Sequence, residues 1–118
     1  MNRGEVMLQV EGSRIFLTRG DTAFLVLHIL DSAENPYNVQ EGDKIYFRLK
    51  SDVFSRQLII EKEIDINSLR LQLDPEDTED LSFTTYKYEI ELVTSTGYHF
   101  TVIENSEFVI RPELEVHA

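Results

Sequence analysis

The residues best suited to perform chemistry form an acidic cluster between positions 74 and 80. Its five carboxylates belong to Asp74, Glu76, Asp77, Glu79 and Asp80. Because Ca²⁺ prefers several oxygen ligands, Asp74, Asp77 and Asp80 are candidate metal ligands. The spacing is not that of an EF-hand, and the cluster lacks the glycine that bends such a loop. A solvated acidic turn at the start of a short helix explains the same residues, since Asp74 is a good N-cap and Pro75 suits the first helical position.

The other reactive side chains lack the spacing that catalysis or metal binding requires. The three histidines, His28, His99 and His117, are far apart in the sequence, and there is no cysteine. We find no nucleophile elbow, phosphate-binding loop, dinucleotide fingerprint or zinc-protease motif. We therefore expect a protein that is not an enzyme and has no cofactor. Tyr37 and Tyr46 lie in a predicted loop and on a polar strand face, where they could contact a glycan.

A period of two in apolar residues indicates that strands position these side chains. About eight or nine strands are expected, near residues 5–10, 15–17, 23–30, 44–50, 58–64, 69–73, 86–92, 98–102 and 108–110. Turn residues separate them, including a turn at Asn105–Ser106. The nearly continuous apolar run 23–30 suits a strand that is covered on both faces or that crosses between sheets. The pattern predicts an all-β sandwich with one short helical turn.

Aromatic residues with the same spacing are expected to pack in the core rather than to form a sugar-binding platform. These residues are Tyr86, Tyr88, Tyr98, Phe100 and Phe108.

Composition limits the domain organisation and the partners. The chain has 118 residues, which fits a single domain over 1–118 with a core at about 5–111. Its formal net charge is −11, from 22 acidic and 11 basic residues, so it repels nucleic acid and anionic lipid. Proteins, neutral glycans or cations are the expected partners. The N-terminal residues lack an apolar stretch, and we expect no signal peptide.

Three segments in order resemble a known family. They are Arg19-Gly20-Asp21-Thr22-Ala23-Phe24, then Gly42-Asp43-Lys44-Ile45-Tyr46-Phe47, then Asp77-Thr78-Glu79-Asp80-Leu81 followed by Tyr86-Lys87-Tyr88-Glu89-Ile90. This order is similar to the N-terminal domain of phage baseplate upper proteins and related prophage tail proteins of Gram-positive bacteria. The resemblance spans roughly residues 8–111.

The resemblance implies an immunoglobulin-like antiparallel β-sandwich that binds other phage tail or baseplate proteins, or itself as a homo-oligomer. Its location would be the virion, or the bacterial cytoplasm before assembly. Members of this family often continue into a C-terminal region that reaches receptor-binding proteins. The printed sequence ends soon after the sandwich would be complete, which leaves a stand-alone adaptor, a truncated prophage relic or one domain of a longer protein as expectations. A carbohydrate- or calcium-binding sandwich is the alternative function.

Seven residues in these segments have predicted structural roles. Gly20 would allow a left-handed turn that Asp21 caps, and Asp77 and Thr78 would hydrogen-bond the backbone of the acidic turn. Leu81 would close the end of the core, and Tyr86 or Tyr88 would enter it. The last arrangement is similar to the tyrosine corner of immunoglobulin-like domains.

Overall fold

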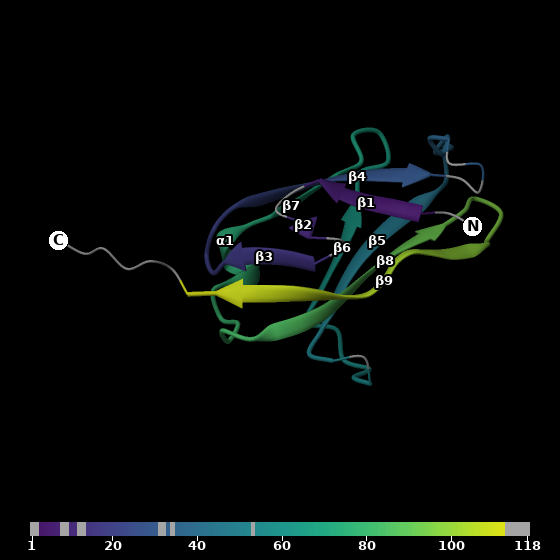
Figure 1. Cartoon of the computed structure of the whole chain (residues 1–118). Helices are drawn as coiled ribbons and strands as arrows, with labels where there is room; N and C mark the ends of the chain where they lie inside the picture. Colours follow the sequence, from purple (N-terminus) through teal and green to yellow (C-terminus); the bar gives the residue numbers. More distant parts are fainter. Residues whose placement is uncertain are drawn as a thin grey trace.

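The computed structural model of the chain describes residues 3–7, 10–11, 14–30, 33, 35–52 and 54–112, with the backbone alone for 3–7, 10–11 and 104–105. Nine strands and one short helix follow one another in this part of the chain (Figure 1). They are β1 (Arg3–Met7), β2 (Val10–Glu11), β3 (Arg14–Thr18), β4 (Ala23–Leu30), β5 (Lys44–Lys50), β6 (Ile60–Ile64), β7 (Arg70–Leu73), α1 (Pro75–Thr78), β8 (Thr85–Val93) and β9 (His99–Arg111).

The strands form two sheets that share one hydrophobic core. A three-stranded sheet has the order β1-β4-β7, and a six-stranded sheet has the order β2-β3-β9-β8-β5-β6. Neighbouring strands are antiparallel except β3 and β9, which pair in parallel from Ile15–Phe108 to Thr18–Arg111. The chain therefore folds as the predicted immunoglobulin-like β-sandwich. The parallel pair departs from the wholly antiparallel sandwich that was predicted, because alternation along one strand carries no information about the direction of its neighbour.

Alternating side chains fill the space between the sheets, as the period of two predicts. In β5, Ile45, Phe47 and Leu49 are fully buried, while the intervening residues lie at the surface. The ring of Phe47 stacks on Tyr88 at 5.6 Å between centroids and meets the edge of Phe108 at 6.0 Å. Burial raises the pKa of the Tyr88 hydroxyl, and its hydrogen bond with Ser106 opposes that rise. These three rings hold the central strands β5, β8 and β9 together.

Three details of the predicted strands are wrong. The strand expected at 5–10 is divided between the sheets, since β1 pairs with β4 and β2 pairs with β3. Asn105–Ser106, expected to be a turn from their residue types, lie within the continuous strand β9, where Ser106 pairs with Tyr88 and the register of the β8–β9 pair shifts nearby. Strand β4 is covered on one face only, since Phe24 and His28 are exposed.

The only helix in the described ranges is the four-residue α1, and no described helix is long and apolar enough to cross a bilayer.

Candidate binding surfaces and the corner of the fold

The turn between β3 and β4 is joined to the α1 turn by a hydrogen bond. Gly20 has a positive φ of 83°, a backbone conformation that glycine adopts without steric cost. Its N–H donates to the hydroxyl of the buried Thr78 at 2.9 Å. The exposed Asp21 donates its backbone N–H to the Thr18 carbonyl at 3.1 Å. The two family-like segments thus meet at one corner of the sandwich.

The acidic cluster is engaged in local interactions at its centre. The carboxylate of Asp77 accepts the backbone N–H of Asp74 at 2.7 Å and the ammonium of Lys62 at 2.5 Å. Asp74 accepts a hydrogen bond from Gln72 at 2.7 Å, and Asp80 is exposed. In this turn, Asp74 and Asp77 both lie close to the ammonium group of Lys62. Among the described side chains, no three His, Asp or Glu residues form a group that could hold a metal ion.

The corner continues into strand β8 through a tyrosine. The Tyr86 hydroxyl accepts the backbone N–H of Ser82 at 3.0 Å and lies 3.4 Å from the carbonyl oxygen of the same residue. This bond back to a residue four positions upstream is the arrangement of a tyrosine corner. Leu81 packs against the core, and its backbone N–H donates to the Thr78 carbonyl at 2.9 Å. Tyr88, two residues further on, lies within the core itself.

A buried carboxylate directly before the start of β5 joins two loops. It was not singled out from the sequence. Asp43 is 3% exposed and accepts hydrogen bonds from the Tyr37 hydroxyl at 3.1 Å and from the backbone N–H groups of Gln40 and Ser95, both at 2.9 Å. Burial and the contact with Asp43 raise the pKa of Tyr37, so this phenol remains the donor. Tyr37 is therefore half-buried and engaged, and is not the exposed contact that was predicted.

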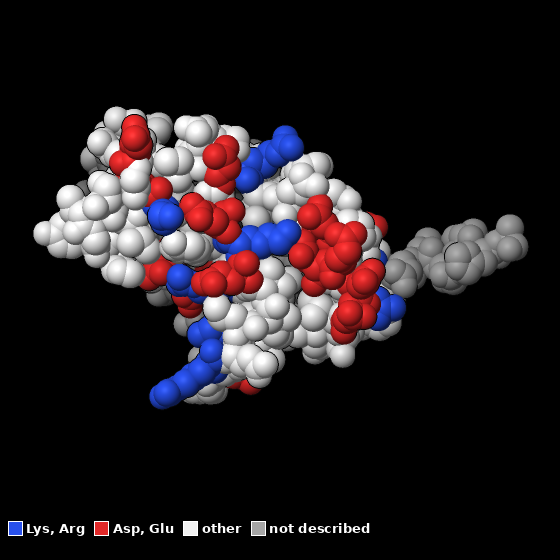
Figure 2. All heavy atoms as spheres, turned by 180° about the vertical axis from the view of Figure 1, so that it is seen from behind, with Lys and Arg blue, Asp and Glu red and all other residues white. Residues whose placement is uncertain are grey.

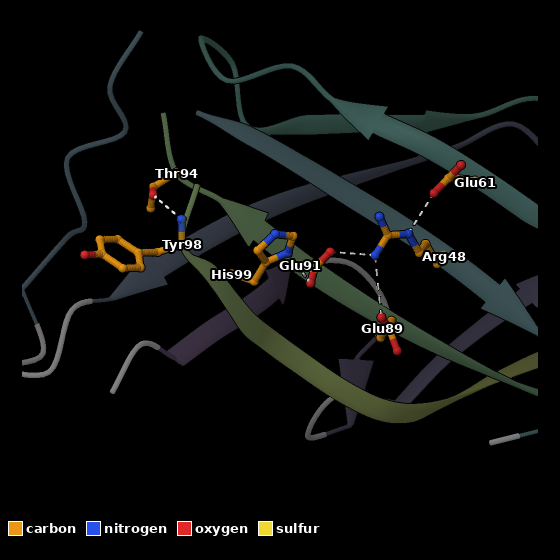
Figure 3. A network of polar contacts seen from close by, with 7 residues as sticks. All are labelled: Arg48, Glu61, Glu89, Glu91, Thr94, Tyr98 and His99. Carbon is orange, nitrogen blue, oxygen red and sulfur yellow. Dashed lines mark hydrogen bonds and ion pairs between the residues drawn. The ribbon is translucent and has the colours of Figure 1, made fainter. Parts of the chain in front are cut away.

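The outer face of the six-stranded sheet carries a network of ion pairs around Arg48 (Figure 3). The guanidinium of Arg48 lies 2.7 Å from Glu61, 2.6 Å from Glu91 and 3.8 Å from Glu89, which come from both neighbouring strands. Glu91 also contacts the ring of His99 at 3.1 Å. The guanidinium lies 4.9 Å from the centre of the Tyr46 ring, which is half-buried beneath it. These contacts hold charged side chains in fixed positions on the outer face of the sheet.

Glu91 makes this network sensitive to pH. Burial raises the pKa of Glu91, but hydrogen bonds and positive charge from Arg48 and His99 outweigh it, so the pKa lies below its ordinary value of 4.5. A lowered pKa in the folded state stabilises the protein above the ordinary value, and this gain is lost as pH falls through the folded-state pKa. We predict that Glu91→Gln lowers the free energy of unfolding by about 1 kcal/mol at neutral pH.

The difference between Glu91→Gln and the unmodified chain should shrink as pH falls from the ordinary pKa of glutamate through the lowered folded-state pKa of Glu91, below which both carry a neutral side chain. Urea denaturation at several pH values measures it. The exposed Glu63→Gln on strand β6 is the matched control. A Glu91→Gln effect that is constant with pH would contradict this prediction.

The surplus of negative charge is not spread evenly. In Figure 2, acidic side chains gather at the α1 end, while over much of the same face Lys and Arg lie next to Asp and Glu. The α1 end contains all five acids of the cluster, and Lys62 pairs with two of them, Asp74 and Asp77. A positively charged partner would be attracted to this end at long range.

Several large apolar side chains are exposed instead of buried. Of the seven phenylalanines, Phe24, Phe54, Phe83 and Phe100 are 39%, 91%, 49% and 42% exposed. Tyr98 is 66% exposed, so the predicted core positions of Tyr98 and Phe100 are wrong. Both lie at the β8–β9 hairpin end, before the register shift that returns β9 to the core. Alternation identifies the face on which a ring lies, but it does not show where the opposite sheet ends.

Arginine side chains cover three phenylalanine rings. Phe24 and Phe83 are exposed, and Phe16 is half-buried. The guanidinium of Arg70 lies 4.3 Å from the centre of the Phe24 ring, and that of Arg19 lies 4.1 Å from Phe83. Phe16 is approached by two guanidiniums, from Arg111 at 4.3 Å and from Arg14 at 5.2 Å. Such cation–π pairs fix the rings in place and leave part of each ring accessible.

A half-open groove of about 340 Å³ lies where β3 turns into β4. Its lining combines the apolar Phe16, Leu17, Ala23 and Phe24 with the polar Thr18, Asp21 and Thr22. The guanidiniums of Arg14, Arg70 and Arg111 lie against the Phe16 and Phe24 rings, Arg14 is paired with Glu107, and Asp21 places a carboxylate in the lining.

Comparisons with known proteins do not identify a family. No family model matches the chain, and no curated protein matches it. Among solved structures, the crystal structure of CopC from Methylosinus trichosporium OB3b matches with a TM-score of 0.46 and 14% identity, over 88% of this chain and 89% of that chain. At this level the similarity supports no conclusion about function.

Proposed function

We propose that this chain is a protein-binding β-sandwich and that it serves as a structural component of a phage or prophage tail. The observation that carries the binding role is the exposure of aromatic rings. Only Phe47 and Phe108 of the seven phenylalanines are buried. Aromatic side chains and arginine are enriched in protein interfaces, where they supply much of the binding energy.

The paired rings and arginines favour protein contacts over other roles. An arginine held on a ring presents a guanidinium in a fixed orientation, so less conformational entropy is lost when a partner binds. The pairs Arg70–Phe24, Arg19–Phe83 and Arg111–Phe16 all have this form. Scattered apolar residues are ordinary on protein surfaces, but rings held in place beside a groove are a feature of binding sites.

The tail role rests on the ordered set of family-like segments. Within the fold, these segments build one corner and one loop junction, through Gly20, Thr78, Tyr86 and Asp43. Those contacts explain why such residues occur together in a sandwich that must keep its loops in fixed positions. A rigid domain of this kind suits a component that binds neighbouring subunits without catalysis.

Co-expression with the proteins encoded beside its gene tests the role. We expect a tail protein to co-elute with the chain in a stoichiometric complex during size-exclusion chromatography. Phe83→Ser and Phe100→Ser should each be compared with Glu63→Gln, which lies on an exposed position of β6. At least one aromatic variant should weaken the complex, and Glu63→Gln should not. A gene located away from any tail genes, together with no binding to tail proteins, would contradict the tail role.

A further inference from the structure

We propose that two copies of this domain associate through the open edge at the start of β9, so that their six-stranded sheets become continuous. The inference rests on the protein-binding role proposed above and is independent of the tail assignment. It joins two features that the fold of a single chain leaves unused, an unpaired strand edge and the exposed rings of Tyr98 and Phe100.

The first residues of β9 have a neighbouring strand on one side only. Strand β8 pairs with them from His99 onward, whereas β3 pairs with β9 only from Phe108. Within the described ranges, no strand pairs with the other side of residues 99–101. An unpaired edge presents N–H and C=O groups to solvent and is therefore a ready template for a strand of another chain.

The hydrogen-bond pattern of the β8–β9 hairpin shows which groups lie at this edge. Thr94 donates its backbone N–H to the Tyr98 carbonyl at 2.8 Å. Bonded and non-bonded pairs alternate along an antiparallel ladder, so Phe100, two residues further on, also forms a bonded pair with β8. The residues on either side of it, His99 and Thr101, therefore direct their N–H and C=O groups away from β8.

This edge is complementary to itself in one antiparallel register. If Phe100 faces Phe100 of the second copy across a twofold axis, the outward N–H and C=O groups of His99 meet those of Thr101 of the second copy. The two Phe100 rings then lie directly opposite each other on one face of the sheet, and each Tyr98 lies opposite Val102. Aromatic and β-branched side chains are favourable cross-strand pairs. One contact would thus cover both of the exposed rings.

The distribution of charge favours association at this edge. Residues 92–103 contain no Asp, Glu, Lys or Arg, and they form the longest such run in the sequence. Repulsion between two chains of net charge −11 is therefore weakened here. Figure 1 shows the β8–β9 hairpin at the opposite end of the sandwich from α1. Antiparallel pairing at the hairpin would therefore keep the two acidic clusters far apart.

Strand β6, at one end of the same sheet, lacks these properties. Glu61, Lys62 and Glu63 are three of its five residues, and charged side chains on an edge strand oppose pairing with another chain. The ammonium of Lys62 also donates to the carbonyl of Gln72 at 3.1 Å and so joins β6 to β7. Charge thus protects β6 from pairing and leaves the start of β9 unprotected.

Sedimentation velocity tests the proposal over protein concentrations from about 1 μM to 1 mM, a range that covers weak specific complexes. We expect the unmodified chain to form a dimer in this range. Phe100→Ser should weaken association at least about 30-fold, as loss of a central interface aromatic does. Phe83→Ser, which removes an exposed ring outside this edge, is the control and should associate like the unmodified chain.

Two substitutions at one position test the backbone pairing itself. Thr101→Pro removes an N–H that points away from β8, a position where an edge strand tolerates proline. It should weaken association at least about 10-fold, because each copy loses a hydrogen bond to the other. Thr101→Val keeps this N–H and should associate like the unmodified chain. Circular dichroism and thermal unfolding identify variants that fail to fold.

Amide hydrogen exchange followed by NMR gives a readout that requires no variant. At low protein concentration, the amides of His99 and Thr101 should exchange faster than that of Phe100, which bonds with β8. At high concentration, protection should increase most at His99 and Thr101. If Thr101→Pro does not fold, this measurement on the unmodified chain decides between pairing and no pairing.

A monomer at about 1 mM, equal association of Thr101→Pro and Thr101→Val, or unchanged exchange of the His99 and Thr101 amides would overturn the proposal. A chain that is monomeric but binds a tail protein would refute self-association and leave the proposed function intact. A chain that dimerises but binds no tail protein would refute only the tail role.

Discussion

Phe47→Ala is expected to lower the free energy of unfolding by about 3–5 kcal/mol, the range for truncation of a buried aromatic ring. Phe47 is fully buried, lies on the inner strand β5, and contacts both Tyr88 and Phe108. Its removal would leave a cavity that three strands border, and the backbone pairs of a sheet cannot move inward to fill it. Chemical denaturation followed by circular dichroism measures the change.

The matched control for this prediction is Phe54→Ala, which removes the same side chain from an exposed turn. It should alter the free energy of unfolding by less than about 0.5 kcal/mol at concentrations where the chain is monomeric. If Phe47→Ala costs less than about 1.5 kcal/mol, the three-ring cluster is not the centre of the core.

Asp43→Ala is expected to cost about 2–3 kcal/mol, because it leaves three donors without their acceptor. The hydroxyl of Tyr37 and the backbone N–H groups of Gln40 and Ser95 all bind this carboxylate. The substitution would also loosen the contact at Gly42, where a Cβ atom would lie only 2.9 Å from that of Ser95. Thermal unfolding and hydrogen exchange in residues 37–43 and 94–97 detect the loss.

Two further variants distinguish the loss of the Asp43 hydrogen bonds from the general effect of removing a negative charge. Asp43→Asn keeps one oxygen acceptor and should cost about half as much as Asp43→Ala. Asp52→Ala removes a carboxylate that binds two exposed backbone N–H groups, and it should cost less than about 1 kcal/mol. Equal losses for Asp43→Ala and Asp52→Ala would contradict the structural role of Asp43.

The fold class was predictable because alternation is a local property. Ile45, Phe47 and Leu49 alternate with polar residues whatever their neighbours are, and each is buried. The short helix was predictable for the same reason, since Asp74 and Pro75 mark its start without help from other strands.

Features that depend on distant segments were not predictable. The division of the N-terminal strand between two sheets and the exposure of Tyr98 and Phe100 depend on where the opposite sheet lies. The network around Arg48 joins residues of three strands, since Glu61 lies on β6 and Glu91 on β8. Asp43 gave only a weak signal, an acid immediately before a strand and after a glycine. Its buried role required knowledge of Ser95, 52 residues away.

The parallel pairing of β3 with β9 has a consequence for synthesis of the protein. It joins residues 15–18 to residues 108–111, so almost the whole chain must leave the ribosome before this part of the six-stranded sheet can form. Pairing over such sequence separation slows folding, and unpaired strand edges are prone to aggregation in the interval. A chain that stops before Phe108 also lacks the third ring of the core. Copies that lack β9 would therefore be exposed to proteolysis, whereas copies that contain it can complete the six-stranded sheet.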